Sequence, residues 1–449
     1  MDNKKLIKKT PNLCIYPWIH LEATALGSIR PCCQNPMTIK DASRDAGGFH
    51  WEELSLADQN TTLEDAYTSP DMINLRRKFL NNERPAVCYK CWTNEKTGMK
   101  SLRQAQTQSG FFDIEKVDLS ADPSFATNMQ SVDLKLGTTC NLQCRICDIA
   151  SSSKFRKETK TILKELGETD GRVDGRMKYY MHRNTWPNNE AFYDNLKIIF
   201  PNLKFMEFFG GEPFLIKKHF EVLKYAIEKG YSKNIAIKYN TNGTQYPKEL
   251  VEDIFPHFER VFIAFSIDDV AERFEYQRHP AKWNEINHNI QRFTELTNVN
   301  LKTEICVTVS IFNILSLDKI IQWINTISVQ GVYFNILSDP QDLNIQSLDE
   351  HVKHTIIEKF KTISWNSLLS RRLDINSSPS DLNENIQTLI NFMLEKHITI
   401  ATSGQPFYGN AVNGPVQEVR KWRIQTFDKL RNENFVKTFP ELAELIGYD

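Results

Sequence analysis

The sequence predicts an α/β fold, in which a partial (β/α)6 barrel lies between a small N-terminal cysteine-rich module and a helical C-terminal region. Strand patterns alternate with helical patterns through the middle of the chain, which is typical of parallel sheets and barrels. Eight of the nine cysteines fall in the first third of the 449 residues, and the last hundred residues show mainly helical periodicity.

Six strand patterns are predicted in the middle of the chain. They are 131–136, Leu203–Phe209, Asn234–Tyr239, Arg260–Ile267, Leu301–Ile311 and Gly331–Leu337. Helical patterns between the later strands are Lys217–Lys229, Pro247–Phe255, Ala281–Thr297 and Leu317–Ser328. A polar stretch at 167–190 interrupts the first strand–helix unit, and we interpret it as an excursion or lid-like insertion. The order favours a parallel sheet or partial barrel.

Alternation along the strands predicts a polar barrel interior. In Leu301–Ile311 the odd-numbered residues are mostly aliphatic, whereas Glu304 and Cys306 lie on the opposite, polar face. Helices should cover the apolar face, so the polar face points inward. Closed barrels fill their interior with aliphatic residues, and buried charges are costly unless they are paired or bound. The pattern therefore predicts an open, TIM-like partial barrel that holds a polar ligand.

The two ends of the chain differ from this middle part. His20–Thr24 and Ser28–Cys32 predict a hairpin around Gly27, and Pro70–Leu80 predicts a helix that precedes two cysteines. Such a module has a thin core, which bound metal commonly compensates. Helical patterns in the C-terminal region are His351–Ile363, Asp381–His397 and Pro415–Leu430. We therefore predict domains at 1–125, 126–340 and 341–449.

Composition excludes several classes of function. Lys and Arg number 55 against 56 Asp and Glu, which disfavours a nucleic-acid partner because phosphate binding relies on concentrated positive charge. No apolar run approaches the length of about 20 residues that a membrane span requires. The start of the chain does not resemble a secretory signal, so we expect a cytoplasmic protein without a membrane partner. An odd number of cysteines in this arrangement disfavours a disulfide framework.

Two groups of cysteines have the spacing of metal ligands. One is Cys88-x2-Cys91, and the other is the triplet Cys140-x3-Cys144-x2-Cys147. A two-residue gap allows both thiolates to bind one metal centre, as in zinc and iron–sulfur sites. Three thiolates on a four-iron cluster would leave one iron open to another ligand. The alternative for the triplet is a zinc site completed by a distant histidine.

Polar residues follow four consecutive predicted strands, at the edge where β/α folds place their chemistry. These candidates for ligand binding are Gly210, Gly211, Glu212 and Pro213, then Asn240, then Ser266 and Asp268, then Asn313. Paired glycines permit a close approach to the backbone, and a hydroxyl with a carboxylate suits a sugar-like diol. Each signal is weak alone, because such residues are also common in turns.

The sequence resembles the radical S-adenosylmethionine (SAM) superfamily in two features. These are the cysteine triplet after a first strand and Gly210-Gly211-Glu212-Pro213 after a second. The resemblance implies that Cys140, Cys144 and Cys147 hold a [4Fe–4S] cluster whose open iron binds SAM. It further implies that Gly210–Pro213 face the methionine amino group and that Asn240 and Ser266 face the ribose. The family reaction is reductive cleavage of SAM to a 5′-deoxyadenosyl radical that abstracts a substrate hydrogen. Ile146 stands where the family usually has an aromatic residue.

The N-terminal cysteines are similar to the twitch module, a shortened SPASM domain that binds an auxiliary [4Fe–4S] cluster. The ligands implied by this similarity are Cys14, Cys32, Cys88 and Cys91. Cys33 is an alternative to Cys32, and a structural zinc site with the same ligands is an alternative to the cluster. Here the module precedes the barrel, whereas the usual order is the reverse.

The function that these resemblances imply is oxidative or crosslinking modification of a peptide or protein, with flavodoxin or ferredoxin as electron donor. Alternatives are dehydrogenation or epimerisation of a small molecule or sugar, and a non-catalytic metal-stabilised binding module. Cys306 is a candidate hydrogen donor or a core thiol, and Glu304 is a candidate acid/base or an ion-pair partner of Lys238 or Lys302. His279 is interpreted as a loop or capping residue.

Overall fold

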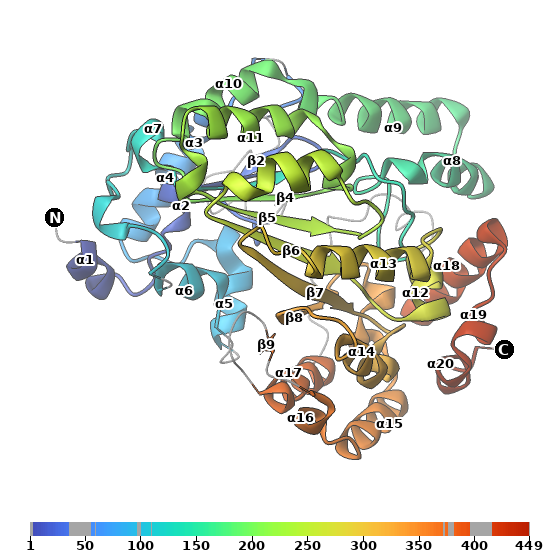
Figure 1. Cartoon of the computed structure of the whole chain (residues 1–449). Coiled ribbons are helices and arrows are strands. Elements are labelled where there is room, and N and C mark those ends of the chain that lie inside the picture. The colour runs from blue at the N-terminus through green and yellow to red at the C-terminus, as the bar shows by residue number, and fades with distance from the viewer. Residues whose placement is uncertain are drawn as a thin grey trace. The chain divides into compact units, whose positions relative to one another are not determined.

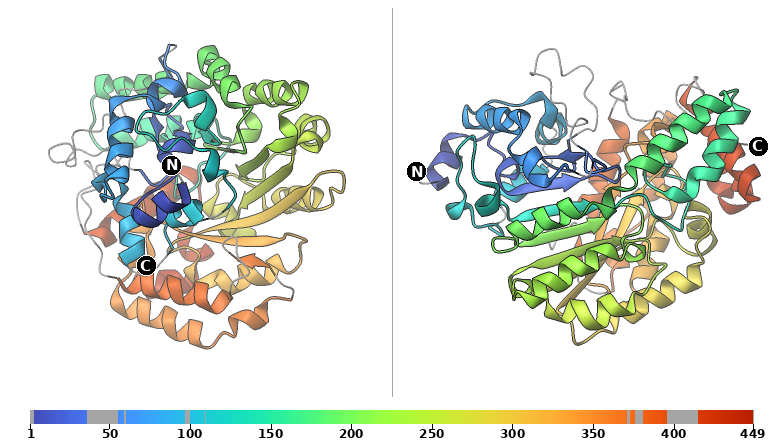
Figure 2. Two further views of the ribbon diagram at one scale, coloured as in Figure 1. Left: turned by 90° about the vertical axis from the view of Figure 1, so that its left-hand side faces the viewer. Right: turned by 90° about the horizontal axis from the view of Figure 1, so that it is seen from above.

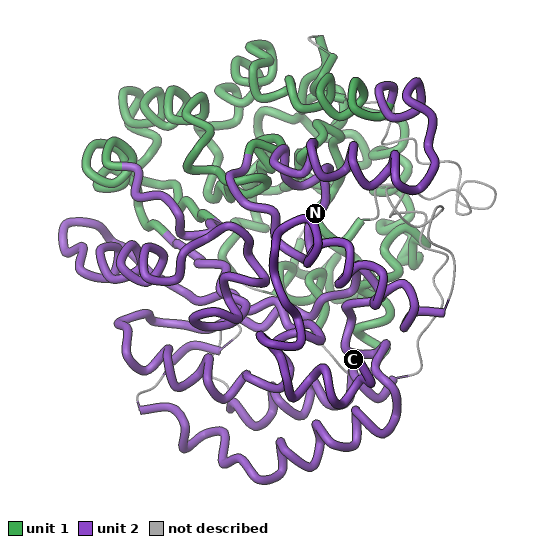
Figure 3. Tube along the Cα trace, turned by 90° about the vertical axis from the view of Figure 1, so that its right-hand side faces the viewer, with its two compact units in different colours: residues 1–139, 176–239, 248–261 green, residues 140–175, 240–247, 262–449 purple. Residues whose placement is uncertain are grey.

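Strands and helices alternate along the chain, as Figure 1 shows for the computed structural model. It describes residues 3–35, 55–58, 60–96, 100–108, 110–370, 373–375, 381–395 and 415–448. The chain forms two units (Figure 3). Unit 1 comprises Met1–Thr139, Arg176–Tyr239 and Lys248–Val261, and unit 2 comprises Cys140–Gly175, Asn240–Pro247 and Phe262–Asp449. The predicted division at residues 125 and 340 stays a prediction.

The strands of the predicted barrel form close to their expected bounds. They are β3 (Ser131–Lys135), β4 (Phe205–Phe209), β5 (Ala236–Thr241), β6 (Arg260–Ser266), β7 (Leu301–Val309) and β8 (Gly331–Ile336). In unit 1, β3 pairs with β4 and β4 pairs with β5, both in parallel. In unit 2, β7 pairs in parallel with β8, and β8 with the short β9 (Asp374–Ile375). Six strands that alternate with helices confirm the predicted α/β class.

The helices of this part of the chain follow the strands. They are α8 (Arg156–Glu165), α9 (Asp170–Arg183), α10 (Glu190–Ile199), α11 (Lys218–Glu228), α12 (Ala271–Gln277), α13 (Trp283–Thr294) and α14 (Leu317–Ile324). The predicted helix Pro247–Phe255 is helical, with a π-helical turn at Leu250–Ile254 that is followed by a 3-10 turn at Phe255–His257. Pro256 has no backbone N–H to donate, which prevents a regular helix from continuing there.

The stretch 167–190, interpreted as an excursion or lid-like insertion, contains the 14-residue helix α9, and its role as an insertion stays a prediction. Its buried residues Val173, Met177 and Tyr180 recur with helical spacing. The pattern was obscured by Gly171 and Gly175 and by the many charged residues between the apolar ones.

One face of the unit 1 sheet is charged, as the alternation predicted. The register places Glu22, Asp133, Glu207 and Lys238 in one row across β1, β3, β4 and β5. Residues of the opposite face, such as Phe208 and Tyr239, are buried and pack against His219 of α11. The helix therefore covers the apolar face and leaves the charged face on the other side of the sheet.

The N-terminal module contains the predicted hairpin, β1 (His20–Ala23) and β2 (Ile29–Arg30), which pair antiparallel. Gly27 has φ +80°, a conformation that suits glycine in this turn. Strand β1 also pairs in parallel with β3. The module's helices gather around the hairpin (Figure 2). They are α1 (Asn3–Lys9), α2 (Tyr16–Ile19), α3 (Leu63–Tyr67), α4 (Pro70–Leu80), α5 (Tyr89–Lys96), α6 (Leu102–Gln108) and α7 (Phe125–Asn128).

The C-terminal region is helical, as predicted. Its helices are α15 (Glu350–Lys361), α16 (Trp365–Leu368), α17 (Leu382–Leu394), α18 (Val416–Arg431), α19 (Phe435–Thr438) and α20 (Pro440–Leu445). Helix α18 is capped by Asn432, whose left-handed φ of 54° turns the chain toward α19. None of the described helices has the length and apolar character needed to cross a membrane.

Candidate functional site

The three-cysteine loop of unit 2, residues 140–147, contains neither helix nor strand and is held by a second loop. Gln143 donates its backbone N–H to the His279 carbonyl at 2.7 Å, and Arg145 donates to the Gln277 carbonyl at 2.8 Å. The backbone N–H of Cys147 donates to the Cys144 carbonyl at 2.9 Å, which closes a tight turn between these two cysteines. The segment 277–279 thus supports the cysteine loop through the backbone.

N–H groups point at the sulfur atoms of this loop. Arg278 Nη1 lies 3.8 Å from Cys144 Sγ, and Asn242 Nδ2 lies 3.8 Å from Cys140 Sγ. A hydrogen bond from Cys147 and the charge of Arg278 together lower the pKa of Cys144 to about 7, against the opposing effect of burial. Donors and a cation directed at thiols stabilise thiolates, which are the form that binds metal. The donor set therefore fits a thiolate-bound iron–sulfur cluster.

Asp268 and Asn313 brace Arg278. The Asp268 carboxylate accepts from Arg278 Nη2 at 2.7 Å and from the Thr308 backbone N–H at 2.9 Å. Asn313 donates to the carbonyl of Asp268 at 2.7 Å and is itself buried. Both predicted cofactor ligands thus have protein partners, and they fix the guanidinium that meets Cys144.

Asn240 and Ser266 lie at the ends of β5 and β6 as expected, and both are half-buried. Asn242, two residues beyond Asn240, also donates to Asn141 Oδ1 at 3.0 Å, which ties the end of β5 to the cysteine loop. Contact of Asn240 and Ser266 with a nucleoside stays a prediction.

The turn Gly210–Pro213 follows β4 in unit 1 and packs against the backbone of residues 137–139. Gly211 donates to the Gly137 carbonyl at 2.9 Å, and Glu212 donates to the Thr139 carbonyl at 2.7 Å. A Cβ on Gly211 would lie 2.2 Å from Thr139 O, and Gly210 has φ +118°. The paired glycines therefore serve a close approach between two chain segments. Contact of this turn with SAM stays a prediction.

Glu304 and Cys306 lie on β7 in unit 2. Lys302 Nζ is 3.3 Å from Glu304 Oε1, so the ion pair that the sequence left open is present. The same ammonium lies 2.7 Å from Asp374 Oδ2. Cys306 is half-buried, and its thiolate would raise the pKa of Arg278, which places it near that guanidinium. A catalytic role for either residue stays a prediction.

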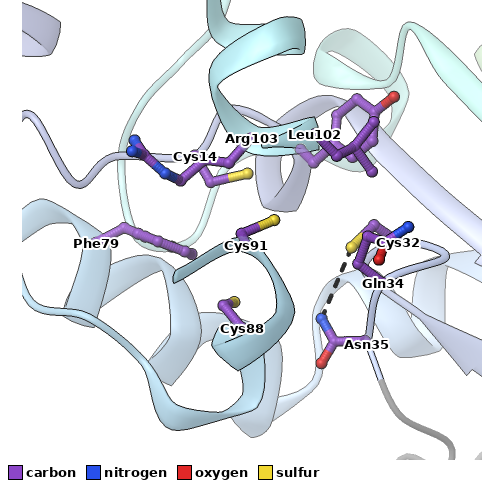
Figure 4. A pocket seen from close by; sticks show the side chains of 10 residues that line it. Cys14, Cys32, Gln34, Asn35, Phe79, Cys88, Cys91, Leu102 and Arg103 are labelled. Atoms are coloured by element: carbon purple, nitrogen blue, oxygen red, sulfur yellow. Dashed lines mark hydrogen bonds between the residues drawn. The ribbon is translucent and has the colours of Figure 1, made fainter. Parts of the chain in front are cut away.

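Cys14, Cys32, Cys88 and Cys91 line one pocket in unit 1, together with Tyr16, Phe79, Leu102 and Arg103. Figure 4 shows their side chains directed into the same space, with Cys88 and Cys91 on the turn of helix that follows α4. Cys33 is not among the residues that line the pocket. Segments far apart in the sequence are thus brought together as four candidate ligands.

The thiols of this pocket lie beside a cation that is held by other protein groups. Burial raises the pKa of both Cys14 and Cys32 to about 12. Asn35 Nδ2 lies 3.9 Å from Cys32 Sγ. Arg103 pairs with Glu95 at 2.8 Å and donates to the Leu13 carbonyl at 2.9 Å, so its guanidinium is fixed beside the thiols. Four thiols with one fixed cation fit a negatively charged cluster with four cysteine ligands.

Over the part of the chain that the structure describes, no three histidine, cysteine or carboxylate side chains are grouped closely enough to hold a single metal ion.

Three groups of functional interest were missed from the sequence. Arg278 carries no motif signal beyond its position next to His279-Pro280. Arg145 lies inside the cysteine motif, where the spacing drew attention to the cysteines alone. Asp428 and Glu433 of the C-terminal region contact Arg145, and no local pattern indicated this long-range pairing.

No protein-family model matches this chain, and no curated protein matches it either. Among solved structures, it is similar to native anSMEcpe with bound AdoMet, with 16% identity over 55% of this chain and 63% of that chain, at a TM-score of 0.36. It is also similar to Streptococcus suis SuiB, with 13% identity over 55% of this chain and 48% of that one, at 0.35. SuiB bound to the precursor peptide SuiA matches at 13% identity over 51% of this chain and 45% of that one, with a TM-score of 0.32. The matches span about half of each solved chain.

Proposed function

We propose that this chain is a radical SAM enzyme with an auxiliary [4Fe–4S] cluster and that it modifies a peptide or protein. The observation that carries the proposal is the three-cysteine loop, whose sulfurs meet N–H groups of Arg278 and Asn242. The four-cysteine pocket of unit 1 supports the second cluster. Peptide or protein is the substrate class implied by the resemblance to the twitch and SPASM families.

When bound at Cys140, Cys144 and Cys147, a reduced [4Fe–4S] cluster would supply the electron that cleaves SAM to a 5′-deoxyadenosyl radical. The chain's own residues would prepare that site. Arg278 offers positive charge and an N–H to Cys144, Asp268 holds Arg278 in place, and Asn242 donates to Cys140. These contacts favour the thiolate form of the ligands.

The charged face of the unit 1 sheet supports a polar substrate. Glu22 is buried and accepts two hydrogen bonds from Arg30 at 2.8 Å, and Lys135 Nζ lies 3.0 Å from it. Next to it in the row, Asp133 Oδ2 lies 3.5 Å from Nε2 of the buried His20. That nitrogen has no hydrogen-bond partner among the described residues, so His20 could still bind a polar group beside the charged row.

Anaerobic reconstitution tests the proposal. We expect about eight irons per chain, four at each site, and 5′-deoxyadenosine when dithionite and SAM are added. A Cys140→Ala, Cys144→Ala, Cys147→Ala variant should retain about four irons and form no 5′-deoxyadenosine. Tightly bound zinc without SAM cleavage would instead identify a non-catalytic metal-stabilised module.

The product defines the substrate class. With a candidate peptide, mass spectrometry should show a loss of hydrogen or a new crosslink that depends on SAM. A modified sugar or small alcohol, with the peptide unchanged, would contradict the peptide assignment while leaving SAM cleavage intact.

A further inference from the structure

The side chain of Arg145, in the three-cysteine loop of unit 2, contacts the C-terminal region. Arg145 lies between Cys144 and Cys147, and its side chain is 1% exposed. Its Nη2 donates to Asp428 Oδ1 at 2.6 Å and also contacts Glu433 Oε2. Its Nε and Nη1 have no hydrogen-bond partner within the described ranges. The polar contacts of this buried cation therefore depend on the two carboxylates.

The same carboxylates hold the loop that supports the cysteines. The Tyr276 hydroxyl donates to Asp428 Oδ1 at 2.8 Å, and His279 Nδ1 lies 2.7 Å from Glu433 Oε1. The guanidinium of Arg145 lies 3.8 Å from the centre of the Tyr276 ring. Asp428 and Glu433 thus each contact the cysteine loop and the segment 276–279 that pairs with it.

Helix α18 places the two carboxylates at this position. Asp428 lies in the last turn of α18. The left-handed conformation of Asn432 reverses the chain, so that the Glu433 N–H donates to the Asp428 carbonyl at 3.0 Å. The second carboxylate oxygen of Asp428 accepts from the Phe435 N–H at 2.7 Å. The end of α18 and the start of α19 are therefore built around the carboxylate that binds Arg145.

We propose that Arg145, Asp428 and Glu433 form a clamp by which the C-terminal region positions the three cysteine ligands. The proposal rests on the proposed function in that these cysteines are taken to hold the SAM-binding cluster. Breaking a buried ion pair leaves an uncompensated charge, and here the unpaired charge would lie inside the ligand loop. Arg145 is thus a positioning residue, and loosening the clamp should release the loop before the rest of the unit.

The test uses two matched variants of the full metal-free chain. Glu433→Gln weakens the clamp, whereas Glu158→Gln weakens the pair of Arg431 with Glu158, at 3.0 Å, which joins the same tail to α8 and makes no hydrogen bond to the cysteine loop among the described residues. Both carboxylates are similarly buried, at 16% and 13% exposure. Alkylation of Cys140, Cys144 and Cys147, followed by mass spectrometry, should accelerate tenfold or more in Glu433→Gln. It should change less than twofold in Glu158→Gln. Equal rates in the two variants would overturn the clamp.

Iron release provides the second readout. After reconstitution, a ferrous chelator should remove the iron of the triplet at least tenfold faster from Glu433→Gln than from Glu158→Gln, while auxiliary iron leaves at the same rate from both. If the wild-type chain takes up no iron at the triplet, the proposed function fails, and the alkylation result still decides the clamp.

A measurement on the wild-type chain covers the case in which Glu433→Gln does not fold. Native-state hydrogen exchange should show that amides of 143–147 and 429–435 open together, with one common free energy. Independent opening of the cysteine loop, with the tail still protected, would overturn the proposal.

Discussion

The two cysteine sites are assembled in different ways. The triplet of unit 2 comes from one short loop, and its sulfurs meet N–H groups of Arg278 and Asn242. The four cysteines of unit 1 come from separate segments and meet in a pocket lined by Phe79 and Leu102, with Arg103 as the cation. One site is local in sequence and polar, and the other is dispersed and largely apolar.

The two sites also differ in the protein contacts that hold the cysteines in place before any metal binds. In unit 2 the backbone of 277–279 and the side chains of Arg278 and Arg145 already fix the loop. In unit 1 the thiols come from loops and short helices, and burial raises the pKa of Cys14 and Cys32 to about 12. Metal should therefore contribute more to folding in unit 1 than in unit 2.

The largest expected effect comes from the two Cys-x2-Cys pairs, which form a matched comparison. In the iron-loaded chain, Cys88→Ser with Cys91→Ser should lower Tm by roughly 10 °C, because structural metal can supply several kcal/mol of folding energy. Cys144→Ser with Cys147→Ser should lower it by less than about 4 °C, because protein contacts already hold that loop. Calorimetry measures Tm for both variants. Equal decreases in Tm would contradict the inference that metal contributes more to folding in unit 1 than in unit 2.

A smaller effect is expected at Gly211, which fixes the chain directly before the triplet. Gly211→Ala would place a Cβ 2.2 Å from Thr139 O, a backbone atom that cannot move without displacing residues 137–139. We expect a loss of roughly 3 kcal/mol in the free energy of unfolding, as in other overpacked sites. Denaturant titration measures this loss.

The control for Gly211→Ala is Gly171→Ala in α9, where an added Cβ meets no atom within 4 Å. That change should stabilise the chain by up to about 1 kcal/mol through helix propensity. If the two variants have the same stability, the close approach at Gly211 is not what the glycine provides.

Much of the fold follows from the sequence because its signals are local. The period of two in Leu301–Ile311 and the helical spacing in Pro70–Leu80 depend only on neighbouring residues, and both elements form within two residues of the expected ends. Helix α9 was missed because its apolar residues are sparse and separated by glycine. The predicted helix Pro247–Phe255 is helical, but its turn at Leu250–Ile254 is π-helical, which the sequence pattern does not distinguish from an α-helix.

The residues of the candidate sites likewise differ in whether a local sequence pattern indicates them. The triplet and the pair Cys88 and Cys91 were identified from local spacing, and Cys14 and Cys32 through the resemblance to the twitch module. Arg278 and the pair Asp428 and Glu433 instead act through contacts across long sequence separations. A buried arginine with carboxylate partners leaves no pattern in one sequence, since Arg, Asp and Glu most often lie on the surface. Asp268 was identified, but its pairing with Arg278 requires the fold.

Substitution of Glu22 tests how much the charged face of the unit 1 sheet, beside the four-cysteine site, contributes to stability. Burial opposes ionisation, but Lys135 and Arg30 hold its pKa at about 2, below its ordinary value of 4.5. A lowered pKa in the folded state stabilises the chain above about pH 4.5, and this contribution is lost as the pH falls toward 2. Glu22→Gln should lose roughly 3 kcal/mol at pH 7 and show a flatter decline of stability between pH 4.5 and pH 2.

The control for Glu22 is Glu249→Gln, which removes a pair with Lys224 on the surface of the same unit. Because both side chains are well exposed, the change in stability should stay below about 1 kcal/mol. Urea titrations at several pH values compare the two variants, and parallel acid profiles for both would contradict the assigned role of Glu22.

The smallest expected effect separates the two interpretations of Glu304. Lys302 retains Asp374 at 2.7 Å when Glu304 becomes glutamine, and the amide oxygen can still accept from the ammonium. Glu304→Gln should therefore change the free energy of unfolding by about 1 kcal/mol or less and leave 5′-deoxyadenosine formation unchanged. If Glu304 serves only as an ion-pair partner, the rate of substrate modification also stays the same. A fall of about 100-fold in that rate, with stability and SAM cleavage unaltered, would instead assign Glu304 to proton transfer.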